Sequence, residues 1–149
     1  MKMPAKALLS TLEAGKIYFF TMDIDSPTAG HRHIFLKKKG EEFLIFVCCT
    51  SQEDTMNRLI QRQRLDPATI VWIRPDAENG LTKDTFVNCN FVVDLSIDEF
   101  IAAYDEGYIQ STGGNQISDA VYAQIVYGIK HSILVAEETI LSCSADKEK

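Results

Sequence analysis

No long apolar run is present in this 149-residue sequence, although 46% of its residues are apolar. A helix that crosses a membrane needs roughly 18 or more consecutive apolar residues, and the sequence has no such segment. The first residues, MKMPAKALLSTLEAGK, also lack the unbroken apolar core and small-residue cleavage site of a secretory signal. We therefore expect a cytoplasmic protein that does not associate with membranes.

Cysteines at metal-binding spacing are also missing. Cys48 and Cys49 are adjacent, Cys89 and Cys143 stand alone, and no C-x-x-C pair occurs, which argues against a zinc knuckle. The first three lie in apolar runs, and we interpret them as buried thiols that behave as small hydrophobic residues. Neighbouring strand residues point to opposite faces, so Cys48 and Cys49 would not share one site. We expect neither a metal ion nor a cofactor.

Positive charge is in deficit, with 15 Lys and Arg against 21 Asp and Glu and a net charge of −6. This balance argues against non-specific binding to nucleic acid, whose phosphate backbone attracts basic surfaces. The charge is unevenly distributed, because residues 1–75 hold 11 basic and 8 acidic residues and the rest of the chain is strongly acidic. The sequence is therefore compatible with a local basic surface on an acidic protein.

The hydrophobic pattern predicts about five strands within a single domain, since no internal repeat, low-complexity tract or linker divides the sequence. The turn at Gly40–Glu41 is expected to join two of the strands in a hairpin. Tyr18 and Trp72 are expected to be core aromatics. Aromatic, β-branched and other apolar residues mark the strands, which we place at residues 16–23, 33–39, 42–49, 69–75 and 85–95.

Capping residues predict where the helices begin. Thr50–Glu53 and Ser96–Glu99 fit the capping-box pattern, and Ser118 precedes an amphipathic segment. We therefore expect a short N-terminal helical turn, helices over residues 50–65, 96–104 and 119–131, a loop over 111–116, and a strand or helix extension over 132–141. Together these elements predict an α+β, mainly β, fold: a small, bent antiparallel β-barrel with appended helices.

The stretch GHRHIF places His31 and His33 on either side of Arg32. A guanidinium offers a planar fork to phosphate oxygens, and an ordinary imidazole exchanges a proton near neutral pH, so one interpretation is phosphate chemistry. The alternatives are a solvated polar strand start, which is the commoner case for so short a run, and a metal site. A regular strand would put the histidines on one face and Arg32 on the other. A loop that reaches Arg32 would let all three meet.

Other polar residues are open to two interpretations each. Thr50 and Ser51 stand where an apolar strand meets a helix, and they either cap the helix or hold a phosphate at its N-terminus. Lys38 and Arg58 belong to basic runs, which are either solvated faces or part of a groove that follows an RNA backbone. Asn88 and Asn90 are expected on one strand face, opposite that of Val87, Cys89 and Phe91, where they satisfy buried backbone groups or read a base edge.

Taken in order, these segments resemble the PemK/MazF-like toxin family, small barrel proteins that are usually ribonucleases paired with an antitoxin. No single motif is specific, and the order of the segments over most of residues 15–132 carries the resemblance. The matching segments are Gly15-Lys-Ile-Tyr-Phe-Phe, Gly30-His-Arg32, VCCTS with Thr50 and Ser51, TFVNCNFVVDLS, and Gly114-Asn-Gln-Ile-Ser118 with the helix that follows.

The resemblance implies one PemK/MazF-like domain over residues 1–149, folded as an SH3-like antiparallel barrel. The tail from about residue 144, which includes ADKEK, is expected to be disordered. The resemblance also implies metal-free cleavage of single-stranded RNA, a homodimer, and control by an antitoxin protein. Arg32 matches the catalytic arginine and would stabilise charge or donate a proton, and Thr50 matches the residue that holds the phosphate. Chemistry alone suggests His31 as the base. We expect His33, Ser51, Arg58 and Lys38 to contact the RNA.

A catalytically inactive barrel of the same fold is the alternative function. It would act as a protein-binding or nucleic-acid-binding module, and the acidic charge balance and the presence of His33 where the family usually has proline motivate it. A fold by itself does not establish an activity. The positions of the side chains around Arg32 are therefore needed to choose between the two hypotheses.

Overall fold

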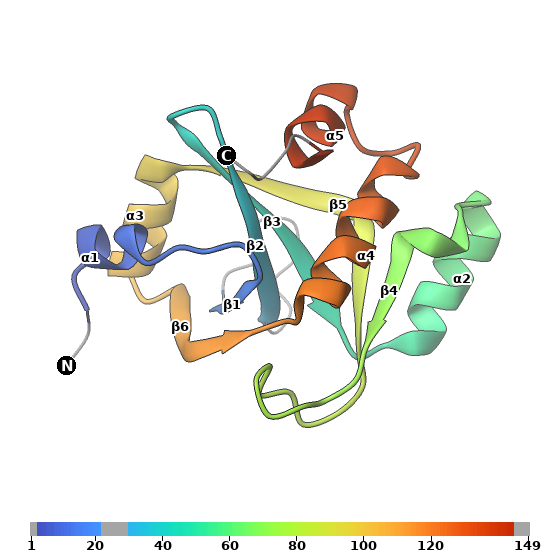
Figure 1. Cartoon of the computed structure of the whole chain (residues 1–149), viewed down its shortest axis with the longest axis horizontal. Coiled ribbons are helices and arrows are strands. Elements are labelled where there is room, and N and C mark those ends of the chain that lie inside the picture. Colours follow the sequence, from blue (N-terminus) through green and yellow to red (C-terminus); the bar gives the residue numbers. More distant parts are fainter. Residues whose placement is uncertain (1–2, 22–29, 145–149) are drawn as a thin grey trace.

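The computed structural model describes residues 3–21 and 30–144, and Figure 1 shows how its helices and strands are arranged. The elements in these residues are α1 (Ala5–Ser10), β1 (Lys16–Phe20), β2 (His31–Lys39), β3 (Phe43–Thr50), α2 (Glu53–Gln63), the short 3-10 helix η1 (Pro67–Thr69), β4 (Ile70–Ile73), β5 (Thr85–Ser96), α3 (Ile97–Asp105), β6 (Ile109–Gln116), α4 (Asp119–Lys130) and α5 (Glu137–Ser144).

The strands form one six-stranded sheet in the order β4-β5-β3-β2-β1-β6, and all neighbouring strands in it are antiparallel. The predicted hairpin is confirmed, since β2 pairs with β3 across the turn at Gly40. The predicted α+β class is confirmed as well.

The sheet is open, whereas the sequence predicted a closed barrel. Strands β4 and β6 end the strand order and do not pair with each other in the part of the chain that the structure describes. The sheet nevertheless curves, since Ile17 of β1 and Val71 of β4, which are not adjacent strands, share one core with Ile125 of α4. Helix α4 packs into this core, and the edge strands β4 and β6 are not joined by the strand pairing that would close a barrel.

Each face of the sheet buries its own core, as the period-2 alternation of the strands requires. One core lies under α4 and α5 and is mostly aliphatic, with Ile45, Val47 and Val87 at its centre. The other is rich in aromatic residues, including Tyr18 and Phe46, and it is covered by α1 and α3. Figure 1 shows these two pairs of helices on opposite sides of the sheet.

Strand β6 contradicts the predicted loop over residues 111–116. The segment is polar and rich in glycine, and its strand conformation comes from pairing with β1. The Thr112 hydroxyl also donates a hydrogen bond of 2.6 Å to the carbonyl oxygen of Ile17. Tertiary pairing has therefore overridden a local preference for a loop, as is common at sheet edges.

Two of the three predicted helix caps are confirmed. Ser96 and Glu99 form a complete capping box, and the Ser118 hydroxyl accepts a hydrogen bond from the Val121 amide at 3.2 Å. The box predicted at Thr50 is wrong, because Thr50 is the last residue of β3 and Gln52 is the N-cap of α2. The strand pairing of Thr50 with Phe86 delays the start of that helix.

Trp72 is 49% exposed, whereas Tyr18 is buried as predicted. The neighbours of Trp72 in the edge strand β4, Val71 and Ile73, face the core, so alternation directs the indole away from it. The ring stacks on Phe86 at a centroid distance of 6.2 Å, and the Arg74 guanidinium lies 4.5 Å from its centroid.

The pairing of β3 with β5 shifts register after Val47, and Asn90, in this irregular part of β5, bonds to side-chain hydroxyls and not to the buried backbone groups that were expected. Its amide donates to the Thr69 hydroxyl at 2.8 Å and accepts from the Ser132 hydroxyl at 2.7 Å. Asn90 is therefore a buried structural residue that does not read a base. Because Phe91 is exposed, the alternation predicted through this segment is wrong.

Three cysteines, Cys49, Cys89 and Cys143, are buried, whereas Cys48 is partly exposed. The segment over residues 132–141 contributes to the separate helix α5 and forms no strand. The predicted end of the first strand at 22–23 and all of the predicted tail except Ser144 lie outside the described residues. No helix within the described ranges is long and apolar enough to cross a bilayer.

Candidate functional site

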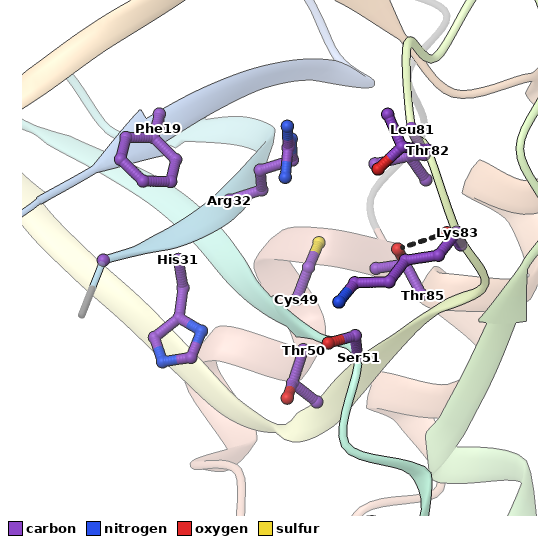
Figure 2. A pocket seen from close by; sticks show the side chains of 11 residues that line it. Phe19, His31, Arg32, Cys49, Thr50, Ser51, Leu81, Thr82, Lys83 and Thr85 are labelled. Carbon is purple, nitrogen blue, oxygen red and sulfur yellow. Dashed lines mark hydrogen bonds between the residues drawn. The ribbon is translucent and has the colours of Figure 1, made fainter. Parts of the chain in front are cut away.

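A small polar pocket lies where β2 begins, β3 ends and the β4–β5 loop crosses them (Figure 2). Its volume of about 130 Å³ is several times the roughly 30 Å³ that one water molecule occupies in the liquid, which leaves room for a phosphate group. The lining residues are Phe19, Gly30, His31, Arg32, Cys49, Thr50, Ser51, Leu81, Thr82, Lys83 and Thr85.

The pocket brings together four of the seven residues that the sequence proposed for the site. His31, Arg32, Thr50 and Ser51 all line it, although nearly twenty residues of sequence separate the two pairs. Antiparallel pairing of β2 with β3 produces this juxtaposition, since His33 lies opposite Cys48 and the pairing direction brings the start of β2 to the end of β3.

Strand alternation divides these residues between two sides. Figure 2 shows Arg32 and Cys49 directed to one side of the strand pair, and His31 and Thr50 directed to the other. Strand β2 begins at His31, so the loop that would have let His31, Arg32 and His33 converge is absent. Arg32 and Thr50 therefore line one pocket but approach it from opposite faces of the sheet.

His33 lies outside the pocket. Its side chain is 7% exposed and its ring stacks on Phe20 with centroids 4.0 Å apart. The Nδ1 atom is 3.1 Å from the His31 carbonyl oxygen. The expected contact between His33 and RNA would require this ring to leave the core, and the metal site proposed for His31 and His33 is not formed. Within the described part of the chain, no three His, Cys, Asp or Glu side chains are grouped to hold a metal ion.

Lys38 and Arg58 also lie away from the pocket. Lys38 is exposed near the far end of β2, opposite Leu44, and it lies six positions along the strand from Arg32, a span of about 20 Å at the usual rise. Arg58 is exposed on α2. If these two residues contact RNA, they would do so at a distance from the pocket.

Gly30 permits the close approach of β1 and β2 at the pocket edge. A Cβ atom at this position would overlap the carbonyl oxygen of Phe20 and lie 2.8 Å from the Cα atom of Thr21. Only glycine avoids this overlap. The glycine in the GHR motif therefore positions the start of β2, and with it His31 and Arg32.

Sequence reasoning missed the β4–β5 loop, which supplies Thr82 and Lys83. The buried side chain of Asn79 helps to hold this loop: its Oδ1 accepts hydrogen bonds from the amides of Asp76 and Leu81 at 3.1 and 2.9 Å. Its Nδ2 donates to the carbonyl oxygen of Arg74 at 2.9 Å. Asn79 and Gly80 are residues typical of turns, but nothing local in the sequence indicates that the residues after them reach β2 and β3.

The pocket is basic. None of the described residues that line it is acidic, although the chain as a whole carries a net charge of −6. Among the described residues the Arg32 side chain has no ion-pair or hydrogen-bond partner, whereas Lys39 pairs with Asp94 and Glu138, both at 3.0 Å. A permanent cation without a partner beside hydroxyl groups is suited to binding an anion.

Two other chemistries fit the pocket poorly. Burial raises the pKa of the Cys49 thiol, with a smaller opposing effect from the positive charge of Arg32, so this thiol remains protonated at neutral pH and is a weak nucleophile. Anion binding by the N-terminus of α2 is opposed by the carboxylates of Glu53 and Asp54 in its first turn. Instead of capping α2, the Thr50 hydroxyl accepts a hydrogen bond from the Gln52 amide at 3.1 Å.

The described part of the pocket thus offers two cationic side chains, an imidazole and several hydroxyls around one small space, without a carboxylate or a reactive thiol. Such a set can bind a phosphodiester and assist proton transfer. No protein-family model matches the sequence, and no curated protein is significantly similar to it.

Proposed function

We propose that this protein is an endoribonuclease that cleaves single-stranded RNA without a metal ion and that an antitoxin partner controls it, as in the PemK/MazF-like family. The observation that carries the proposal is the composition of the pocket, in which Arg32, Lys83 and His31 occur with hydroxyl side chains and, among the residues that the structure describes, without a carboxylate. A cluster of cations on an acidic chain is suited to a phosphodiester substrate.

In the proposed reaction the ribose 2′-oxygen attacks the adjacent phosphorus and the bond from phosphorus to the 5′-oxygen breaks. The products are a 2′,3′-cyclic phosphate and a free 5′-hydroxyl. His31 would take the proton from the 2′-hydroxyl, and Arg32 would stabilise the charge that develops on the phosphorane. A guanidinium keeps its proton near neutral pH, so the leaving oxygen would take its proton from solvent. Thr50, on the same side as His31, would face the ribose.

An aromatic surface beside the pocket supports a single-stranded substrate. Thr50 of β3 lies opposite Phe86 of β5, and Phe86 lies opposite Trp72 of β4, so the three form a row on one face of the sheet. Trp72 is largely exposed, and the Arg74 guanidinium lies over its ring. Exposed aromatic side chains beside cations are the usual platform for unpaired bases.

The finer features of the family are part of the same proposal. The curled six-stranded sheet would be an opened form of the SH3-like barrel, with α4 in the position where the barrel would close. The protein would act in the cytoplasm as a homodimer. Its apolar groove between β4 and α4, lined in part by Val71 and Tyr127, is a surface available to protein partners.

A library of DNA oligonucleotides that each contain one ribonucleotide, in randomised sequence context, tests this proposal. We expect cleavage only on the 3′ side of the ribonucleotide, in excess EDTA, because only that position has the 2′-hydroxyl nucleophile. Oligonucleotides made entirely of DNA serve as the control. Cuts at deoxyribonucleotides, or cuts that disappear on adding EDTA, would count against the reaction described here.

A catalytically inactive binding module is the second candidate, and the opposite orientations of Arg32 and Thr50 favour it. If the two side chains cannot act on one phosphate, the pocket would bind RNA or an acidic protein segment without cleaving it. Stable binding of long RNA without any cleavage, by protein that circular dichroism shows to be folded, would support this function.

A further inference from the structure

Lys83 is held over the pocket by a rigid loop. The loop is fixed by the buried side chain of Asn79 and by Leu81, which belongs to the aliphatic core. The Thr85 hydroxyl donates a hydrogen bond of 3.1 Å to the carbonyl oxygen of Lys83 itself. The backbone of Lys83 is thereby tied to the first residue of β5, which pairs in turn with β4. The position of this lysine relative to the pocket is therefore set by the fold.

Lys83 and Arg32 line the same pocket from different elements. Figure 2 shows the Lys83 side chain crossing from the loop toward Ser51 and Cys49, on the side of the strand pair to which Arg32 points. Thr50 is directed to the other side. On the Arg32 side, the pocket therefore has a second cation, Lys83, with the Ser51 hydroxyl beside it. Thr50 does not belong to this side.

Both cations lack a neutralising partner among the residues that the structure describes. Lys83, like Arg32, takes part in no ion pair or side-chain hydrogen bond there. Lys39, in contrast, has two carboxylate partners. Two unpaired cations facing one space repel each other, and an anion bound between them removes that repulsion.

From this geometry we infer that Lys83 is a second phosphate-binding residue, which holds the scissile phosphodiester together with Arg32. The inference depends on the proposed ribonuclease function. A phosphodiester carries one negative charge, and the phosphorane formed on 2′-oxygen attack carries two, so a pair of cations matches the transition state better than one does. Lys83 thereby takes over the phosphate contact that the sequence assigned to Thr50.

The kinetic test compares Lys83→Ala, Lys83→Arg and Lys130→Ala on one single-stranded RNA in excess EDTA. Lys130 is exposed at the end of α4 and does not line the pocket, so its variant makes the same charge change elsewhere. We expect kcat/KM to fall about 10- to 100-fold for Lys83→Ala, the usual effect of losing a hydrogen bond to a charged group. Lys83→Arg should retain most of the activity, and Lys130→Ala should match the wild type.

The salt dependence of binding separates a phosphate contact from a structural role. The probe is a fluorescent 2′-O-methyl RNA of the same sequence, which cannot be cleaved because its 2′-oxygen is blocked. Loss of one phosphate contact lowers the slope of log K against log salt by about 0.7 for a single strand. We expect this decrease for Lys83→Ala and not for Lys83→Arg or Lys130→Ala, with thermal unfolding of all variants unchanged.

The outcomes distinguish the inference from the proposed function. Wild-type protein that binds the probe without cleaving RNA would overturn the ribonuclease, and a reduced slope for Lys83→Ala would then still identify a phosphate contact. Wild-type protein that cleaves RNA while Lys83→Ala matches Lys130→Ala in both rate and slope would overturn the role of Lys83 alone.

Discussion

Replacing Arg32 with alanine is expected to lower the rate of RNA cleavage on the order of 10²- to 10³-fold, the usual cost of removing one group that stabilises a developing anion. The guanidinium faces the pocket without a partner among the described residues, so its removal breaks no ion pair there. The side chain is also exposed. We therefore expect the free energy of unfolding to change little, and the variant can be assayed under the same conditions as the wild type.

Arg32→Lys provides the matched control, because it keeps the positive charge and removes the planar fork. We expect an intermediate rate for this variant in single-turnover cleavage of one RNA. If Arg32→Ala were as active as the wild type, the charge-stabilising role of Arg32 would be wrong.

The largest effect on stability is expected for Gly128→Leu. Gly128 is buried in α4, and a Cβ atom there would lie 2.7 Å from the carbonyl oxygen of Ala68 and 2.9 Å from the Cys89 sulfur. Since α4, η1 and β5 cannot all retain their positions around a larger residue, we expect the free energy of unfolding to fall by about 3 kcal/mol, in the upper part of the usual range for overpacked cores. For a chain of this length, that corresponds to a decrease in Tm of roughly 6–12 °C.

Gln124→Leu is the control, because it introduces the same side chain at an exposed position of the same helix. Chemical denaturation of both variants, followed by circular dichroism, measures the difference. If Gly128→Leu were as stable as Gln124→Leu, the close approach of α4 to η1 and β5 would be incorrect.

Features that depend on a few neighbouring residues were predictable from the sequence. The capping box at Ser96 and Glu99 formed as expected, and the hairpin between β2 and β3 followed from two apolar runs joined at Gly40. Arg32, Thr50 and Ser51, which the family resemblance placed in one site, line one pocket because β2 pairs with β3.

Features decided by tertiary contacts were not predictable. Strand β6 has a polar, glycine-rich sequence and gains its conformation from pairing with β1. The box at Thr50 failed because pairing with Phe86 keeps this residue in a strand. The side to which Arg32 points depends on whether β2 begins one residue before it, and a shift of one residue reverses the face.

The β4–β5 loop of the candidate site is also positioned by tertiary contacts that the sequence does not reveal. Lys83 has no distinguishing neighbour in the sequence, and its position depends on a buried amide, that of Asn79. The hydrogen bonds of that amide depend on the three-dimensional course of the loop, and no periodic pattern in the sequence predicts them. The sequence therefore proposed four of the eleven lining residues, and the second cation of the pocket was found only in the structure.

The most direct test of the proposed function is to identify the chemical ends of RNA fragments made by the wild-type protein in excess EDTA. We expect fragments that end in a 2′,3′-cyclic phosphate and begin with a 5′-hydroxyl, because the 2′-oxygen is the nucleophile. Intact RNA in the presence of folded protein, or fragments with 5′-phosphate ends, would contradict the proposed function.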